Sequence, residues 1–426
     1  MHLRKKPKIA IITIRNNYNY GGVLSCLKVV HSFCQRYFDS KVFFLGFDHE
    51  VATSLRALKF ISSVKPLSYF GMNCIEIGAR WSFWEPGHYF FTSETWRQLL
   101  KNYDYFFVVS GSCIAAHPLI VLNKKFVMWV GTPHTEDRQE RIKQLTGLRY
   151  FLHLMAHGRM KAIEKEILSQ ATATLAISTY AKGKFEQIIG KPKESITLCG
   201  FPMDCIRHPV AAEKDFDEII IMAVGRFSDP RKNVTMLLNV FDKVYARNQH
   251  IKLYVVGKKP EPDTMAAFAN HTSLVNVTFT GQITKDDLEA LYDRAHLFLI
   301  TSHQEGLGIV GLEALLHGIP VVATDCGGTR DYVIDGISGY LVAINDSDDM
   351  VAKICMILSN KQLYQHLSYN GRKLIEESFS FANTYTLFKK ALCDTYPNLQ
   401  AWFEECDHQK AVKENKAKAH FFQDAV

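Results

Sequence analysis

The chain alternates short apolar runs with longer amphipathic stretches over most of its length. In the first half the apolar runs predict strands, and the longer amphipathic stretches at 23–36 and 138–169 predict helices; the expected strands are 8–14, 41–47, 105–109, 126–130, 174–178 and 195–198. These strands lack clean polar alternation, which indicates burial on both faces in a parallel sheet covered by helices. The pattern therefore predicts an α/β fold.

The second half repeats this alternation more clearly. The expected strands are 218–224, 251–256, 275–280, 296–301, 320–324 and 339–342, and the expected helices are 233–247, 285–293, 309–317, 348–359 and 362–378. Pro202, Pro209 and a polar run interrupt the pattern between the halves. We expect two Rossmann-like, doubly wound domains, 1–205 and 206–380, that face each other across a cleft. Ligands of such domains bind at the carboxyl ends of the strands.

The C-terminal segment 381–426 is expected to begin with a helix over 381–395 that packs back on the first domain. From Ala401 onward the sequence is polar and rich in lysine, which predicts a terminal helix or a mobile tail.

Charge is shared unevenly between the two halves. The 426-residue chain has a net charge of +7, but residues 1–205 hold 27 Lys and Arg against 15 Asp and Glu, a balance of +12 that leaves −5 for the rest. A basic first domain favours an anionic partner such as phosphate, an acidic glycan or an anionic membrane surface. A basic surface that is simply solvated remains the alternative. We expect no nucleic-acid partner.

Targeting and metal signals are missing from the sequence. The apolar run 9–14 is too short for a secretory signal, and no apolar run approaches the roughly 18 residues of a membrane span. The ten cysteines form no CxxC pair and no zinc-type spacing with histidine, so we expect reduced, mostly buried thiols. We therefore expect a soluble, cytoplasmic protein without a bound metal or cofactor.

Two glutamates, Glu305 and Glu313, flank a glycine-containing turn between a predicted strand and a predicted helix. Gly306 and Gly308 leave the backbone bare where that helix begins. Free N–H groups and the positive end of the helix dipole suit a phosphate. We expect Glu305 to face a bound sugar and Glu313 to accept hydrogen bonds from a ribose diol.

A basic cluster follows another predicted strand. Gly225, Arg226, Arg231 and Lys232 lie between the strand at 218–224 and the helix at 233–247. A diphosphate leaving group gains charge as its bond to a sugar breaks. An arginine that binds it with two hydrogen bonds and a lysine that acts as a point charge suit that group.

Taken together, these motifs resemble the retaining glycosyltransferases of the GT-B fold, and specifically glycosyltransferase family 4. The resemblance covers most of 218–342 and consists of Gly225-Arg226 with Lys232, Gly281, Thr301 to Gly306, Glu313-Ala314, Gly318 to Val322, Gly327-Gly328, and Asp335-Gly336 with Gly339. The combination is highly specific, although any one piece alone is weak. The sequence departs from the family pattern at Leu307, where phenylalanine is usual, and at 327–331, which lacks the commoner Pro-Glu.

The resemblance implies a role for each matched position. It implies that Arg226 and Lys232 bind the donor diphosphate, that Glu305 contacts the donor sugar and that Glu313 holds the ribose. It also implies backbone contacts to sugar and phosphate from the turn made of Gly306, Leu307, Gly308 and Ile309. The two departures leave the identity of the donor sugar open.

The first half resembles the family mainly in two loops. Gly21 and Gly22 open the helix after the first strand, where bare backbone can approach the diphosphate from the other domain. His134 follows the strand at 126–130 and resembles the family's histidine beside the donor sugar. Turn glycines and an ordinary loop histidine are the simpler interpretations of these residues.

The predicted activity is metal-independent transfer of a sugar from a nucleotide diphosphate sugar to a glycan or lipid-linked acceptor, of the hexosyltransferase type, with retained anomeric configuration. A glycan phosphorylase, a sugar-nucleotide epimerase and a non-catalytic glycan-binding protein are the alternatives.

Two further stretches carry two interpretations each. Asp346-Ser347-Asp348 has the form of a metal-binding carboxylate pair, but capping of the following helix is the simpler account. The stretch 138–169 mixes basic and apolar residues, so it either packs on its own core or lies peripherally on an anionic membrane surface, such as the inner face of the membrane.

Overall fold

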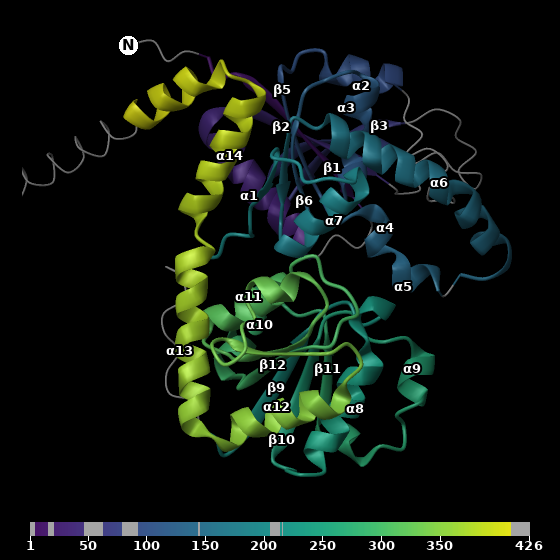
Figure 1. The fold of residues 1–426 in the computed structure, drawn as a ribbon, viewed down its shortest axis with the longest axis vertical. Helices are drawn as coiled ribbons and strands as arrows, with labels where there is room; N and C mark the ends of the chain where they lie inside the picture. Colours follow the sequence, from purple (N-terminus) through teal and green to yellow (C-terminus); the bar gives the residue numbers. More distant parts are fainter. Residues whose placement is uncertain are drawn as a thin grey trace, which may run out of the picture.

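The computed structural model describes residues 5–15, 21–46, 63–78, 93–143, 145–204, 214 and 216–409. Two α/β units follow each other along the chain, the first coloured purple to teal and the second teal to green in Figure 1. Each is built on a mainly parallel sheet whose central strands are almost continuously apolar and buried. This confirms the predicted α/β fold class, because strands covered by helices on both faces need no polar side.

The first sheet has the order β3-β4-β2-β1-β5-β6-β7-β8. Its strands are β1 (Lys8–Arg15), β2 (Asp39–Gly46), β3 (Val64–Tyr69), β4 (Met72–Gly78), β5 (Tyr105–Ser110), β6 (Val127–Val130), β7 (Ala173–Ala176) and β8 (Ile196–Leu198). The edge hairpin β3–β4 is a correction to the predicted all-parallel sheet, because β3 pairs antiparallel with β4. Its outer strand is largely exposed, so the apolar pattern that marked the buried strands is absent there.

The helical segments of the first domain are α1 (Gly22–Tyr37), α2 (Ser93–Leu100), η2 (Cys113–Ala116), α3 (His117–Val121), α4 (His134–Asp137), α5 (Gln139–Ile142), α6 (Gly147–Gln170) and α7 (Thr179–Ile189). The single helical stretch predicted over 138–169 was wrong in its first part. There the chain forms the short helix α5, and the helix breaks before α6 begins at Gly147. Both α5 and α4, which lies just before the predicted stretch, turn toward the second domain (Figure 1).

The second sheet has the order β11-β10-β9-β12-β13-β14, with every pair parallel. The strands are β9 (Ile219–Val224), β10 (Ile251–Val256), β11 (Val277–Gly281), β12 (Leu297–Ile300), β13 (Val321–Thr324) and β14 (Gly339–Val342). The helical segments are η4 (Pro230–Lys232), α8 (Val234–Tyr245), α9 (Pro262–Ala266), η5 (Thr272–Asn276), α10 (Lys285–Arg294), α11 (Ile309–Leu316), η6 (Gly328–Asp331), α12 (Ser347–Ser359) and α13 (Lys361–Ser378). Each of the six predicted strands is present to within two residues.

The chain returns to the first domain after α13. Helix α14 (Phe381–Thr395) lies against the first sheet, as Figure 1 shows, and its Phe388 is fully buried. Beyond it the Tyr396 hydroxyl donates to the Lys125 carbonyl at 2.6 Å, and the Trp402 ring N–H donates to the Tyr37 carbonyl at 2.9 Å. The described C-terminal segment, up to residue 409, therefore packs on the domain where the chain began.

Both sheets reverse their strand order at one point, between β1 and β5 in the first sheet and between β9 and β12 in the second. Loops that leave the carboxyl ends on either side of such a point diverge and leave a crevice for a ligand. The loops after β9 and β12 carry the charged residues singled out in the sequence, so the topology gathers them at one edge. Among the described helices, none has both the length and the apolar character needed to span a membrane.

Candidate active site

An ion pair joins the two loops that leave β9 and β12. The Lys232 ammonium lies 2.6 Å from the Glu305 carboxylate, and the Ser302 hydroxyl donates to the same carboxylate oxygen at 2.7 Å. The loop backbones are also bonded, because the His303 N–H donates to the Arg231 carbonyl at 2.7 Å. Two predicted site residues that are 73 positions apart in sequence are thus held together.

The surroundings of Glu305 keep it ionised. Burial by itself would raise the pKa of this carboxyl, but attraction and hydrogen bonding from Lys232, with further help from Ser302 and Arg231, hold the pKa below its ordinary value. The Lys232 side chain crosses Gly225, where an added Cβ would lie 3.2 Å from the lysine Cε. A side chain at position 225 would therefore crowd the lysine that reaches Glu305.

Arg231 is held by the protein's own acidic groups. Its guanidinium donates to Asp137 of the first domain, to Asp229 at 3.0 Å and to Gln304 at 3.1 Å. Arg141 of the first domain in turn donates to Asp229 at 2.7 Å. The structure therefore places Arg231 in an ion-pair network that bridges the two domains. The sequence had suggested it as a ligand to the donor.

Arg226 is held less closely by acidic side chains than Arg231. Its side chain is 43% exposed, and its nearest ion-pair partner, Asp229, is 3.8 Å away. Burial of part of the guanidinium lowers its pKa, and the nearby Arg231 and Arg141 lower it further, against the opposite effect of Asp229. An anion in the cleft would relieve this repulsion between like charges, so Arg226 is well placed to bind a phosphate.

The turn between the two glutamates is kept bare by close packing. Gly308 caps α11 with a φ of 80°, and an added Cβ there would lie 2.7 Å from the Tyr332 hydroxyl. That hydroxyl donates to the Gly308 carbonyl at 2.8 Å. A Cβ at Gly328 would lie 2.2 Å from the Gly306 carbonyl. Leu307 is buried. The turn is consequently fixed from behind, with its amides at the start of a helix.

The first-domain loops contact the same turn. A Cβ at Gly22 would lie 3.2 Å from the Ile309 side chain, and one at Gly306 would lie 3.0 Å from the Thr132 methyl group. The Ser178 hydroxyl donates to the Gly306 carbonyl at 2.5 Å. Gly21, with a φ of 145°, caps the helix that begins at Gly22. The glycine loop of the first domain therefore faces the second-domain turn across the interface.

His134 begins α4, two residues beyond the Thr132 that touches Gly306, and is 6% exposed. Its backbone N–H donates to the carboxylate of Glu164 at 2.5 Å. The structure thus brings the His134 segment to the same turn as Glu305, although from the opposite domain.

Glu313 lies behind the turn, in the first part of α11. Its carboxylate accepts a hydrogen bond from the Tyr292 hydroxyl at 3.0 Å. Burial raises the pKa of Glu313 to about 7, and the nearby Glu289 adds to the effect, while the hydrogen bond from Tyr292 opposes it. A ligand that donates hydrogen bonds to this carboxylate, as a ribose diol does, would favour the ionised form.

Several contacts across the interface had no signal in the sequence. Asp137, Arg141 and Asp229 form the bridging network described above, and Asp331 accepts hydrogen bonds from the Thr179 amide, at 2.8 Å, and from its hydroxyl. Each residue taken alone is an ordinary charged residue. Only the folded arrangement of the two domains brings the partners together.

Asp346 caps α12, because its carboxylate accepts the Asp349 amide at 2.9 Å. This is the simpler of the two interpretations that its sequence allowed. Within the described ranges, no group of three or more His, Cys, Asp or Glu side chains is arranged to hold a metal ion.

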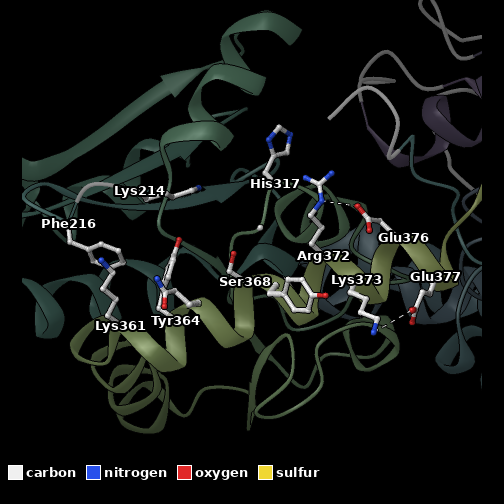
Figure 2. A pocket seen from close by; sticks show the side chains of 13 residues that line it. Lys214, Phe216, His317, Lys361, Tyr364, Ser368, Arg372, Lys373, Glu376 and Glu377 are labelled. Carbon is white, nitrogen blue, oxygen red and sulfur yellow. Dashed lines mark hydrogen bonds and ion pairs between the residues drawn. The ribbon is translucent and has the colours of Figure 1, made fainter. Parts of the chain in front are cut away.

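A separate pocket of about 620 Å³ lies on the second domain, away from the cleft (Figure 2). Its cations are engaged by the protein itself. Arg372 donates to the Leu316 carbonyl and to Glu376, both at 2.9 Å, and Lys214 donates to the carbonyls of Tyr292 and Ala295. We therefore assign the candidate site to the loops after β9 and β12, where they meet the first domain.

The raised pKa of Glu313 predicts a pH-dependent effect of Glu313→Gln. Between pH 4.5 and about 7 the Glu313 carboxyl keeps its proton in the folded protein but has lost it in the unfolded chain. The contribution of Glu313 to the free energy of unfolding is therefore complete below pH 4.5 and is lost as the pH rises through 7. The variant, which cannot ionise, should gain stability relative to wild type from pH 5 to pH 8, by at most about 3 kcal/mol. Denaturant unfolding at both pH values measures this difference.

The exposed Glu377 of α13 provides the matched control, and Glu377→Gln should follow the wild-type profile. If the difference in unfolding free energy between Glu313→Gln and wild type is the same at pH 5 and pH 8, the raised pKa of Glu313 is wrong.

Comparisons with known proteins agree with this architecture. The chain is 17% identical to the solved structure of a sucrose-phosphate synthase from Thermosynechococcus elongatus, with a TM-score of 0.71 over 93% of this chain and 100% of that one. It is also 17% identical to HepE from Anabaena in a complex with UDP and glucose, with a TM-score of 0.67 over 91% and 99% of the two chains. These likenesses establish the GT-B arrangement of the two domains.

Sequence comparison finds relatives of the second domain. The chain is 26% identical over 255 residues to the capsular polysaccharide biosynthesis glycosyltransferase CapM of Staphylococcus aureus, which covers 56% of this chain and 64% of CapM. The match thus spans less than two thirds of that relative. A sequence model of the family described as glycosyl transferases group 1 matches residues 207–374, the part that holds the ion pair, the glycine turn and both glutamates. Over residues 207–374 the second domain is thus similar to the glycosyl transferases group 1 family.

Proposed function

We propose that the protein transfers a sugar from a nucleotide diphosphate sugar to a glycan or lipid-linked acceptor, with retention of anomeric configuration. The observation that carries the proposal is the meeting, at one edge of the second sheet, of Lys232, Arg226 and the bare amides around Gly308, opposite the Gly21–Gly22 loop. A pyrophosphate is the ligand that uses positive charge and free amides together.

In the proposed reaction the bond between the sugar C1 and the diphosphate oxygen breaks, and an acceptor hydroxyl bonds to C1 on the same face. Arg226 and Lys232 stabilise the charge that grows on the departing diphosphate. The sugar passes through an oxocarbenium-like state, and the acceptor proton goes to the departing diphosphate oxygen. Because these cations already serve the diphosphate, the mechanism requires no metal ion.

The ion pair of Lys232 with Glu305 gives both residues a role in donor binding. An incoming diphosphate attracts the lysine, and the freed carboxylate of Glu305, one residue before Gly306, can then accept hydrogen bonds from the sugar hydroxyls. Contacts from the first domain, including Ser178 to Gly306, close the cleft over this point and exclude water that would hydrolyse the donor.

The nucleobase is the first property to determine. Because HepE was solved with UDP, uridine donors are the first candidates, and a thermal-shift screen with UDP, GDP, ADP and their sugars compares them directly. A ligand at one hundred times its dissociation constant stabilises the protein by about 2.7 kcal/mol, which is easily measured. Stabilisation by none of the three families of nucleotide would contradict the proposal.

Product analysis separates this activity from its alternatives. An epimerase converts the donor without an acceptor, and a phosphorylase releases sugar phosphate only when inorganic phosphate is present. A transferase forms a new glycosidic bond and releases the nucleoside diphosphate.

The cationic residues predict a loss of turnover. Lys232→Ala and Arg226→Ala should each reduce kcat on the order of 100-fold or more, because each removes charge that stabilises the departing diphosphate. Steady-state rates with a saturating donor measure this loss, and thermal melting shows that the variants remain folded.

Lys252→Ala is the matched control, since Lys252 forms a surface ion pair with Glu218. It should retain wild-type kcat. Near-normal turnover in either Lys232→Ala or Arg226→Ala would remove that residue from the mechanism.

We further propose that the protein acts at the cytoplasmic face of a membrane, which α6 contacts. The second part of α6 packs inward through residues such as Met160, Ile163 and Ile167, whereas its first part turns apolar side chains outward. Leu148, Phe151 and Met155 follow one another at helical spacing and are 72%, 57% and 68% exposed.

Basic residues follow this apolar stripe further along the helix. Arg159, Lys161 and Lys165 of the same helix are exposed. A partly apolar, basic helix face suits an anionic lipid surface, where each cation contributes about 1 kcal/mol and the apolar side chains enter the headgroup region. A lipid-linked acceptor would be presented at such a surface.

The triple variant Leu148→Ser, Phe151→Ser, Met155→Ser should bind anionic vesicles at least 10-fold more weakly than wild type, because burial of each apolar side chain is worth about 1.5–3 kcal/mol. Co-sedimentation with vesicles of phosphatidylglycerol and phosphatidylcholine at low salt measures this binding.

Val275→Ser removes an equally exposed apolar residue from the second domain, at 80% exposure, and should leave binding unchanged. If wild-type protein fails to sediment with anionic vesicles at low salt, the membrane proposal is wrong.

A further inference from the structure

Glu164 of α6 is a carboxylate enclosed by the first domain. Among the carboxylates in the described ranges it is the one with no exposed surface. Burial raises the pKa of its carboxyl, and the hydrogen bonds that it accepts oppose this effect. Placing a carboxylate inside a protein costs several kcal/mol, and the cost is offset only where hydrogen bonds or opposite charges surround it.

Nearly all the groups that stabilise this carboxylate belong to one short segment. The His134 amide donates to it at 2.5 Å, the Thr135 hydroxyl at 3.2 Å, and the Thr135 amide contributes a further hydrogen bond. The Cys113 thiol, 3.4 Å away, also donates to it, and the positive charge of Arg138 attracts it. Glu164 therefore binds the start of α4 in the way that a capping side chain binds a helix N-terminus, but from a distant position in the sequence.

Helix α4 needs this support, because it is only four residues long. A single turn fixes several backbone dihedrals for one hydrogen bond and is unstable alone. Its own N-cap, Pro133, has no side-chain oxygen or nitrogen to accept the first amides. Glu164 supplies the missing acceptor, with the favourable sign of charge for a helix N-terminus.

The segment that Glu164 holds is the first-domain wall of the candidate site. On one side, Thr132 packs on Gly306. On the other, Asp137 and Arg141 make the ion pairs with Arg231 and Asp229 that bridge the domains. His134 lies between these contacts. A shift of α4 would therefore move His134, which is predicted to lie beside the donor sugar, together with the bridging ion pairs.

We propose that Glu164 is a positioning residue for the transfer reaction, which acts by fixing the His134–Arg141 segment against the second domain. This inference rests on the proposed function. It differs from a general role in folding, because a well-packed apolar residue would stabilise the interior of α6 without the cost of burying a charge. The carboxylate is the group that orders α4.

Glu164→Gln tests the inference with little change in shape. The amide group of glutamine brings its own N–H donors toward the His134 and Thr135 amides, so it cannot accept all the bonds that the carboxylate accepts. We expect faster hydrogen exchange at residues 133–138 and a kcat at least 10-fold lower. The dissociation constant for UDP should stay within twofold of wild type, because the second domain binds the diphosphate.

Glu166→Gln is the matched control on the same helix, where Glu166 is exposed and accepts a bond from Gln170. It should leave exchange, kcat and UDP binding unchanged. Thr135→Val removes one donor to Glu164 and should produce a smaller effect in the same direction, about 2- to 5-fold in kcat. It also serves as the test if Glu164→Gln does not fold.

Three results would overturn the inference. They are unchanged exchange at 133–138 in Glu164→Gln, a kcat within twofold of an active wild type, or a parallel loss of kcat and UDP affinity, which would indicate a general structural role. If the wild type transfers no sugar from any donor, the proposed function fails instead, and the exchange measurement still decides whether Glu164 orders α4.

Discussion

The ion pair between Lys232 and Glu305, 2.6 Å long and largely buried, is the interaction on which the rest of the site depends. It joins the loops that leave β9 and β12 at the point where the strand order of the second sheet reverses. Sheet topology brings the loops close, and the two charges fix how they meet. In the proposed function the two charges separate when a donor binds, and the ammonium then contacts phosphate while the carboxylate contacts sugar hydroxyls.

The first domain completes the site by contacts that reach across the interface. Arg141 and Asp137 exchange ion pairs with Asp229 and Arg231, while Ser178 bonds to the glycine turn. These contacts hold Arg231, while Arg226 and Lys232 are the cations that the proposed function assigns to the diphosphate. Preorganised charge of this kind is worth more in a closed cleft than in water, because little rearrangement is needed when the leaving group becomes charged.

Much of the fold followed from the sequence, because buried parallel strands leave strong apolar runs. The six strands of the second sheet were predicted to within two residues, and so was α14. The β3–β4 hairpin was missed, because its outer strand is exposed and carries no such run. The break between α5 and α6 in the helix predicted at 138–169 was also missed. Arg141 of α5 is bonded to Asp229 of the second domain, and no local pattern encodes that contact.

Part of the candidate site could likewise be predicted from the sequence, and part could not. Lys232, Glu305 and Gly308 could be predicted from the sequence, because glycines and charged residues that follow a buried strand mark the ligand-binding edge of a parallel sheet. The partners of Arg231 were not predictable, because they come from the other domain and depend on how the two domains pack. As a result the sequence suggested a donor ligand where the structure has an ion-pair network.

A crystal structure of the protein with UDP bound tests the central claim most directly. The account predicts that the diphosphate lies within about 3 Å of the Lys232 ammonium and of the amides around Gly308, with Lys232 drawn away from Glu305. A diphosphate bound elsewhere, with the Lys232–Glu305 pair intact, would contradict it.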